Sequence, residues 1–318
     1  MINKIGIVGG GNIGGVLAAE IVSRRLARNV ALVDVKGPDM AAGKCLDIAE
    51  AMPVYGSDVN IVGAKTYDIL AGCDFVINTA GVPRTMRPDG TYPSRDELLA
   101  INLKITDQVA DGINKYAPGA FIISIANPLD AIVYRLYKKI NKCNPKRIMG
   151  MAGVLDSARY KYFVAEAAGV SVENIEAVVL GGHGDTMVPI RSACRVYGLP
   201  VEQFVPAKKL DAIEDRTRNA GGEVVKLLGS GSAFVSPAIS ALEMVEAIAF
   251  DKKKIVPVCA LLQGEYSVKG LFVGVPCVLG KDGIEKIIKI KLTSEESAAL
   301  KKSVAAVKKT CAEVDAAK

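Results

Sequence analysis

The chain has 318 residues, half of them apolar and 23% charged, with a formal net charge of +6. This length allows two domains or one large α/β unit, and the composition is typical of a globular protein. The basic residues are scattered, with no run longer than 252–254, so we expect no nucleic-acid partner. No apolar run is long enough to cross a bilayer and the N-terminal residues do not resemble a targeting segment, so we expect a cytoplasmic protein without a membrane partner.

The seven cysteines argue against both a disulfide framework and a metal site. Their number is odd, no two have CxxC spacing, and the chain has a single histidine. We therefore expect no metal, and thiols that are reduced and mostly buried.

The first predicted strand, residues 4–8, is a short apolar run that leads directly into Gly9-Gly10-Gly11-Asn12-Ile13-Gly14. This segment has the spacing GxGxxG, and a helical pattern follows it. In such a loop the first glycine makes a tight turn, the second lets the backbone reach a pyrophosphate, and the third allows close helix–strand packing. The sequence therefore predicts a dinucleotide-binding loop at Gly9, Gly11 and Gly14, with the helix N-terminus facing the phosphates.

A second strand, residues 30–33, ends in Asp34, twenty positions after Gly14. A carboxylate at this place accepts a hydrogen bond from the adenosine 2′-hydroxyl and repels a 2′-phosphate, so NAD is favoured over NADP. The alternative is that Asp34 is only a turn residue, which the surrounding strand–helix–strand pattern disfavours.

The alternation of strands and helices continues with strands at 75–81 and 121–128. The first ends in Thr79-Ala80-Gly81 and the second in Asn127-Pro128, so a ligand could approach the carboxyl ends of both. The pattern predicts an α/β fold, a Rossmann doubly wound parallel sheet, over residues 1–148. We expect an α+β substrate or catalytic domain over residues 149–318.

A long loop, 82–94, contains three prolines and the two arginines Arg84 and Arg87. Loops of this length are usually functional or disordered. The next helix is predicted to start with a capping box at 94–97. Its expected apolar face is Leu98, Ile101, Ile105, Val109 and Ile113. Arg95 falls in the first turn, where a cation opposes the helix dipole, so a role against an anion or a polarised carbonyl is an alternative to a structural one.

In the second half, Asp156 and Arg159 are three apart on a predicted helix and share one face. A surface ion pair is the simplest interpretation, but the apolar flanks indicate burial, and buried charges need partners or a function. His183, the only histidine, lies in Gly181-Gly182-His183-Gly184-Asp185 after a strand at 177–180. The glycines let the backbone approach a neighbour closely, and the local sequence leaves a structural and a proton-transfer role open.

The remaining segments predict helices at 211–228 and 232–249 and antiparallel strands within 255–280. A C-terminal helix is predicted to begin with a capping box at Thr293–Glu296 and to pack through Leu300, Val304 and Val307 on the body or on a partner subunit.

Taken in order, these motifs resemble the NAD-dependent malate/lactate dehydrogenase family over essentially the whole chain. The sequence is most similar to the malate dehydrogenases that are close to lactate dehydrogenases, which are commonly tetramers. The resemblance implies NAD as cofactor, a small dicarboxylate or 2-oxo acid as substrate, a place in the tricarboxylic acid cycle, and a homo-oligomer, with a tetramer preferred over a dimer.

The resemblance also implies roles for the polar residues. His183 would be the acid/base and Asp156 would orient it, while Arg159 would bind the substrate carboxylate and Arg95 would polarise the carbonyl. Asn127 would contact both substrate and cofactor. The implied cofactor-binding residues are Gly9, Gly11, Asn12, Ile13, Gly14, Asp34, Thr79, Ala80, Gly81, Asn102, Ile125 and Asn127.

One departure from the family pattern affects the substrate. Family malate dehydrogenases bind the second carboxylate through an arginine at the position of Arg84, but the usual spacing to the next arginine is RxxxxxR, and here ten residues separate Arg84 from Arg95. Either Arg84 or Arg87 could therefore face the substrate. Two loop cations favour malate over lactate, because oxaloacetate is a dianion. Lactate dehydrogenase is the alternative, and a non-catalytic NAD-binding protein is a third, disfavoured by the set Asp156, Arg159 and His183.

Overall fold

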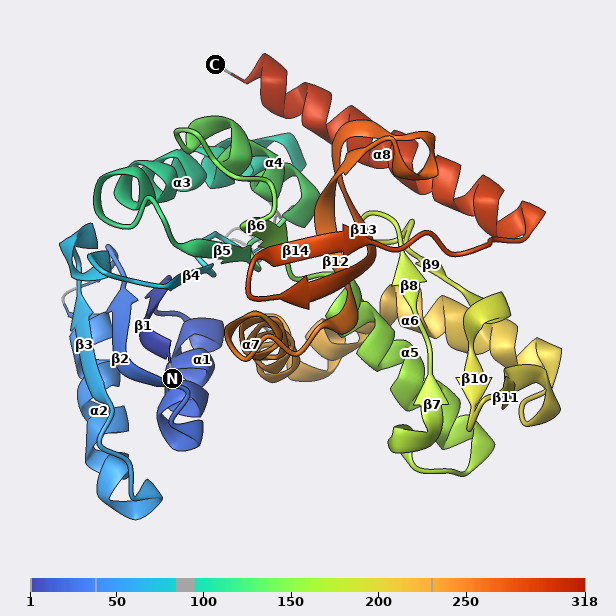
Figure 1. The fold of residues 1–318 in the computed structure, drawn as a ribbon, viewed down its shortest axis with the longest axis horizontal. Helices are drawn as coiled ribbons and strands as arrows, with labels where there is room; N and C mark the ends of the chain where they lie inside the picture. Colours follow the sequence, from blue (N-terminus) through green and yellow to red (C-terminus); the bar gives the residue numbers. More distant parts are fainter. Residues whose placement is uncertain (1, 38, 84–94, 230, 318) are drawn as a thin grey trace.

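A computed structural model describes residues 2–37, 39–83, 95–229 and 231–317, with only the backbone of Arg95 and Asp96. A nine-stranded sheet crosses the described part of the protein in the order β14-β13-β12-β6-β5-β4-β1-β2-β3 (Figure 1). The first six strands along the chain pair with one another in parallel. These strands are β1 (Ile2–Val8), β2 (Ala27–Val33), β3 (Asn60–Ala64), β4 (Phe75–Asn78), β5 (Phe121–Ser124) and β6 (Ile148–Gly150).

The parallel strands have the doubly wound order, in which the chain winds from β1 to one side and then returns to the other. One face of the sheet is covered by α1 (Asn12–Arg24) and α2 (Met40–Tyr55). The other face is covered by α3 (Arg95–Tyr116) and α4 (Leu129–Lys139). The predicted Rossmann sheet is therefore confirmed, and the carboxyl ends of its strands meet at one edge.

The second half of the chain extends this sheet. The antiparallel strands β12 (Lys254–Gln263), β13 (Lys269–Gly280) and β14 (Gly283–Ile287) join it through a pairing of β12 with β6. Helix α7 (Val235–Ala249) packs on the same face as α1, and α8 (Ser294–Ala316) packs on the face of α4. The sheet is thus continuous across the predicted division after residue 148, which falls within β6.

A separate small core lies in the lobe at the lower right of Figure 1. It is built around α5 (Gly153–Ala168) and α6 (Ala207–Leu228). Short strands complete the lobe: β7 (Ile175–Glu176), β8 (Val179–Leu180), β9 (Val188–Pro189), β10 (Arg195–Val196) and β11 (Leu199–Pro200). Single 3₁₀ turns connect elements: η1 (Tyr67–Leu70), η2 (Val172–Asn174), η3 (Arg191–Ala193), η4 (Val201–Gln203) and η5 (Glu265–Ser267). The predicted α+β character of the second half is confirmed by these elements.

The predicted apolar face of α3 is partly wrong. Ile101 is 38% exposed, whereas Leu99 and Leu103 are buried. Asn102 and Thr106 are also buried, so polar residues occupy part of the face that packs against the sheet. The capping box of α8 is confirmed by reciprocal bonds between Thr293 and Glu296.

All seven cysteines are free thiols, and all except Cys143 are buried. Over the described ranges, no helix combines the length and the hydropathy required to span a membrane.

Candidate active site

The glycine-rich loop joins β1 to α1 at the carboxyl edge of the sheet. Gly9 has a φ of +106°, and its N–H donates to the carbonyl oxygen of Val33 at 2.8 Å. A Cβ on Gly14 would overlap the carbonyl oxygen of Gly9, so glycine alone lets α1 begin this close to the strand. A Cβ on Gly11 would meet no atom within 4 Å. The backbone at Gly11 is therefore open to a phosphate at the N-terminus of α1.

Asp34 follows β2 and lies beside this loop. Its Oδ2 accepts a hydrogen bond from the backbone N–H of Gly10 at 2.7 Å, and its Oδ1 accepts from the N–H of Lys36 at 2.9 Å. The carboxylate lines a cavity of about 200 Å³, whose wall also contains Gly9, Gly11 and Ala80. Its position suits the predicted hydrogen bond to a ribose hydroxyl.

A second cavity, of about 210 Å³, adjoins the first, because Gly11, Thr79 and Gly81 line both. Thr79 is held in place by its Oγ1, which donates to the carbonyl oxygen of Gly9 at 2.9 Å. Other predicted cofactor residues complete the wall of the second cavity, namely Asn12, Ile13, Ile125 and Asn127. The loops after β1, β4 and β5 therefore enclose one continuous groove.

Asn102 supports this groove from behind. Its side chain is buried, and its Oδ1 accepts from the N–H of Val82 at 2.7 Å. Its Nδ2 donates to the carbonyl oxygen of Asn127 at 2.9 Å. The amide thus ties the loop after β4 to the loop after β5, so its predicted part in holding the cofactor is indirect here.

His183 and Asp156 come from different elements and meet through a hydrogen bond. Asp156 lies in the first turn of α5, with a side chain only 3% exposed, and its Oδ2 is 2.9 Å from Nδ1 of His183. A carboxylate on Nδ1 favours the tautomer in which this nitrogen carries the proton, so Nε2 is left to act on another molecule. The imidazole itself is 18% exposed.

Burial and charge act in opposite directions on His183. Burial lowers the pKa of its imidazole, whereas the charge and hydrogen bond of Asp156 raise it, with a further contribution from Asp130. Arg159 opposes these carboxylates. The net effect is a pKa above the ordinary value, so a larger fraction of the imidazole carries a proton at neutral pH.

Arg159 is a buried cation with much of its hydrogen-bonding capacity available. Its side chain is 15% exposed, and its Nη1 lies 3.6 Å from Oδ1 of Asp156, beyond hydrogen-bond distance. Within the described residues, that carboxylate oxygen has no hydrogen-bond partner. Burial lowers the pKa of Arg159 and Asp156 raises it, but a guanidinium stays charged at neutral pH. Its planar donors suit a carboxylate ligand.

Of the three arginines predicted in and after the loop, the structure describes only the backbone of Arg95. Arg84 and Arg87 lie outside the described residues. Arg95 begins α3, as the sequence predicted within one residue, and its side chain also lies outside the described part.

Sequence reasoning missed several residues near the site. Lys44 of α2 donates from Nζ to the carbonyl oxygen of Gly11 at 2.8 Å. Tyr67 lines the cavity of Asp34, and Phe234 lines the second cavity. Asp130 and Ser303 bind the backbone next to His183. None of these has a local motif, except that Asp130 follows Asn127-Pro128 by two positions.

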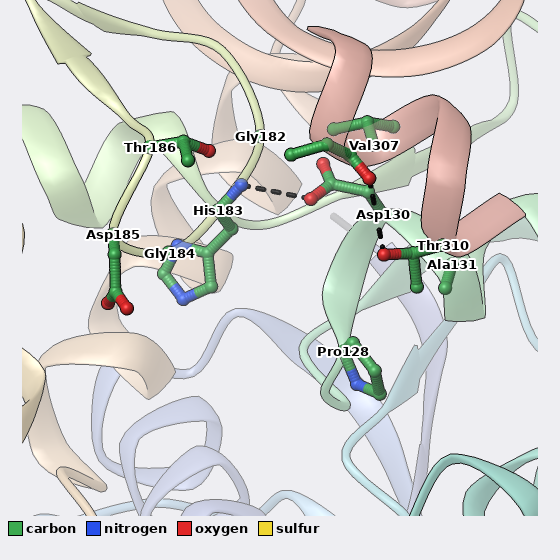
Figure 2. A pocket seen from close by; sticks show the side chains of 11 residues that line it. Pro128, Asp130, Ala131, Gly182, His183, Gly184, Asp185, Thr186, Val307 and Thr310 are labelled. Carbon is green, nitrogen blue, oxygen red and sulfur yellow. Dashed lines mark hydrogen bonds between the residues drawn. The ribbon is translucent and has the colours of Figure 1, made fainter. Parts of the chain in front are cut away.

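A third cavity, of about 270 Å³, begins at Pro128, the neighbour of Asn127, and is lined by His183 (Figure 2). This cavity lies between α4, α8 and the turn that carries His183, and it shares no lining residue with the first two cavities. The open backbone at Gly11 and the carboxylate at Asp34 fit the pyrophosphate and ribose of a dinucleotide. A dinucleotide groove together with an imidazole hydrogen-bonded to a carboxylate in the same molecule is the combination expected of a nicotinamide-dependent dehydrogenase.

Comparisons with known proteins identify the family. The model of the lactate/malate dehydrogenase NAD-binding domain matches residues 3–150, and that of the lactate/malate dehydrogenase α/β C-terminal domain matches residues 153–318. The chain belongs to the lactate/malate dehydrogenase family and is an NAD-dependent 2-hydroxy acid dehydrogenase.

Three relatives illustrate the similarity. The malate dehydrogenase of Geobacter sulfurreducens is 51% identical over 314 residues, which cover 96% of each chain. The apo malate dehydrogenase of Picrophilus torridus has a TM-score of 0.93 and 40% identity, covering 100% of this chain and 98% of that one. The lactate dehydrogenase of Cryptosporidium parvum, complexed with lactic acid and nicotinamide adenine dinucleotide, has a TM-score of 0.93 and 39% identity, covering 99% and 98%.

Proposed function

We propose that the protein interconverts (S)-malate and oxaloacetate with NAD. The observation that carries this proposal is the cluster in which Asp156 contacts both His183, at 2.9 Å, and Arg159, at 3.6 Å. Relatives at 48–51% identity are malate dehydrogenases, which supports malate over lactate.

The residues divide the chemistry between them. NAD, when bound, supplies the carbon that accepts or returns a hydride. Arg159 holds the carboxylate beside the reacting carbonyl as a bidentate pair. His183 donates its Nε2 proton to the carbonyl oxygen during reduction and takes it back during oxidation, while Asp156 stabilises the protonated ring. We assign Arg95 to polarising the carbonyl and Asn127 to contacting both substrate and cofactor, on the family resemblance.

The second carboxylate of oxaloacetate needs a further cation, which we assign to Arg84. An unpaired buried guanidinium is costly, so a site that contains one prefers a dianion to pyruvate. The test is the ratio of kcat/KM for oxaloacetate to that for pyruvate, with NADH. We expect oxaloacetate to be preferred and Arg84→Gln to lower this ratio at least about tenfold, the loss of one charge-assisted pair.

Arg87→Gln is the matched control. If it lowers the ratio and Arg84→Gln does not, the assignment moves to Arg87. A preference of the unmodified enzyme for pyruvate would replace the malate proposal with lactate dehydrogenase, for which the lengthened loop is the supporting observation.

A non-catalytic NAD-binding role is the remaining alternative. His183→Asn removes the proton donor but leaves the groove from Asp34 to Asn127 intact. We expect turnover to be lost while NADH affinity stays within about twofold, since the substituted ring lies outside the phosphate and ribose contacts. Unchanged turnover would contradict the proposed role of His183.

We further propose that residues 1–148 bind the cofactor and residues 149–318 supply the acid/base and Arg159. The family resemblance supports a cytoplasmic enzyme of the tricarboxylic acid cycle. The compartment and the metabolic cycle are proposed from the family and the substrate rather than from a feature of the fold.

We also propose a homo-oligomer, a tetramer in preference to a dimer, and exposed apolar side chains support it. On α2, Leu46 and Val54 are 61% and 88% exposed, and near the end of α6, Leu227 is 80% exposed. Phe234 links the two helices, because it lines one cavity with α2 and another with Leu228. An interface between subunits would remove these apolar side chains from water.

A further inference from the structure

The backbone before the imidazole of His183 is bonded at three consecutive positions. The N–H of Gly181 donates to the carbonyl oxygen of Gly274 on β13 at 2.9 Å. The N–H of Gly182 donates to Oγ of Ser303, also at 2.9 Å. The N–H of His183 itself donates to Oδ2 of Asp130 at 2.9 Å. The segment is therefore fixed from β13, α8 and α4 together.

Positions 181 and 182 have no room for a side chain, because α8 lies against this segment. A Cβ on Gly181 would lie 2.5 Å from Oγ of Ser303, and a Cβ on Gly182 would lie 2.5 Å from Cγ2 of Val307. Ser303 is fully buried, and its hydroxyl also lies 3.2 Å from Oγ1 of Thr186, on the other side of the histidine. Ser303 thus contacts the turn that carries His183 on both sides of the histidine, at Gly182 and at Thr186.

Asp130 holds the same turn from α4. Its side chain is 8% exposed, and its Oδ1 accepts from the thiol of Cys259 at 3.2 Å while Oδ2 accepts from His183. Figure 2 shows the carboxylate pointing at the backbone nitrogen of His183, with the imidazole on the other side of that nitrogen. With both oxygens bonded, Asp130 has little freedom to move.

We propose that Asp130 and Ser303 are positioning residues that set the placement of the His183 imidazole by holding the backbone of residues 182 and 183. The inference rests on the proposed role of His183 as the acid/base. Asp156 fixes the ring through Nδ1, but a ring tethered at one atom can still move with its backbone. The bonds from α4 and α8 remove that freedom, so Nε2 stays at one place relative to Arg159. Misplacement of a reacting group by about 1 Å can cost about a hundredfold in rate.

Charged groups face His183 from two other elements. Asp156 and Arg159 approach from α5 and Asp130 approaches from α4, whereas α8 presents the uncharged Ser303. Burial lowers the pKa of His183, and the two carboxylates raise it. Burial also raises the pKa of the Asp130 carboxyl itself. Asp130 therefore acts in two separable ways, through its hydrogen bond and, when it is ionised, through its charge.

The first test is Ser303→Ala, with Ser240→Ala as the matched control. Ser240 is also a buried serine on a helix, but its hydroxyl donates to the carbonyl of Ser236 within the same helix, at 2.8 Å. We expect Ser303→Ala to lower kcat at least about tenfold while NADH affinity and Tm stay close to those of Ser240→Ala, since a small displacement of the imidazole suffices. Equal kcat values for the two variants would overturn the part assigned to Ser303.

The second test is Asp130→Asn, which keeps an acceptor for the His183 N–H but removes the charge. We expect kcat for oxaloacetate at pH 6 to fall by no more than about threefold, because the hydrogen bond survives. The alkaline limit of kcat/KM should move to lower pH, since a charge that raises the pKa of His183 is lost. Asp130→Ala removes the acceptor and should lower kcat at least about tenfold. A kcat for Asp130→Ala equal to that of Asp130→Asn would overturn the part assigned to Asp130.

His183→Asn, measured alongside, separates the two levels of the argument. If it abolishes turnover while Ser303→Ala behaves like Ser240→Ala and Asp130→Ala behaves like Asp130→Asn, the positioning inference fails and the proposed function stands. If His183→Asn retains turnover, the proposed function itself fails.

Discussion

At the level of single residues, the site depends on an imidazole whose environment sets when it carries a proton. Burial alone would favour the neutral ring, yet the hydrogen-bonded carboxylate of Asp156 reverses this effect. Asp156 raises the pKa of His183 although its Oδ1 also lies 3.6 Å from Nη1 of Arg159, a contact too long for a hydrogen bond. The Asp156 carboxylate thus faces both the imidazole of His183 and the guanidinium of Arg159.

The pH dependence of reduction follows from this environment. In the proposed mechanism, reduction of oxaloacetate needs a protonated His183, and the pKa of this imidazole is raised above its ordinary value. We expect kcat/KM for reduction to be constant below that ordinary value and to fall as pH rises through the raised pKa. In Asp156→Asn the fall should begin at lower pH, and kcat should drop at least about a hundredfold because the tautomer is no longer enforced. Initial rates from pH 5 to 9 measure both effects.

The control is Asp58→Asn, which neutralises an exposed carboxylate. Its pH profile should match that of the unmodified enzyme. A profile of Asp156→Asn with the same limit would mean that Asp156 does not set the pKa of His183.

The residues that we assign to the chemistry were easier to single out in the sequence than those that hold them in place. Asp156, Arg159 and His183 stand out because polar residues interrupt apolar or glycine-rich segments. Ser303 has no such signal, because it is an ordinary serine on an amphipathic helix, 121 positions from its partner Gly182. Its position depends on the packing of α8, which the local sequence does not contain.

At the level of elements, strand–helix alternation was enough to predict β1, β2, β4 and β5 and the doubly wound parallel sheet, whereas β3 and β6 were not singled out. The continuation through β12 was not predictable, because it depends on a single long-range pairing, Cys259 with Gly150. The apolar face of α3 was misjudged for a related reason. Asn102 and Thr106 are buried because their side chains bond to backbone, which a pattern of apolar residues cannot reveal.

The junction of β1 and α1 gives a direct test at this level, with neighbouring glycines as variant and control. In Gly14→Ala the Cβ overlaps the carbonyl oxygen of Gly9, so the strand and helix must separate. In Gly15→Ala the Cβ lies 3.4 Å from Nζ of Lys44, the mobile end of a long side chain. We expect Gly14→Ala to lower Tm and weaken NADH binding at least about tenfold, through displaced phosphate contacts.

Gly15→Ala should leave Tm unchanged or raise it slightly, because alanine favours a helix over glycine by up to about 1 kcal/mol. Thermal melts and NADH titration measure both variants. Equal NADH affinities would show that close packing at Gly14 is not needed for the cofactor groove.

At the level of the whole molecule, the continuous sheet joins the cofactor groove rigidly to the strands beneath His183. Gly181 pairs with Gly274 of β13, and β13 belongs to the same sheet as β1. The segment that carries His183 is therefore tied to the sheet of the glycine-rich loop by backbone pairing. The apolar side chains of α2 and α6 take no part in this arrangement, so their exposure needs a different explanation.

The proposed assembly would cover α2 and the end of α6, and it can be tested with charges. We expect the unmodified protein to sediment as a species larger than the 33.5 kDa chain. Leu46→Glu and Leu227→Glu should each shift it toward the monomer, because burying an unpaired carboxylate costs several kcal/mol. Val172→Glu is the matched control, since Val172 is 50% exposed on η2, away from both helices. Sedimentation velocity distinguishes the outcomes. If Leu46→Glu and Leu227→Glu stay assembled like the control, another surface forms the oligomer. If the unmodified protein is monomeric, the proposed assembly is wrong.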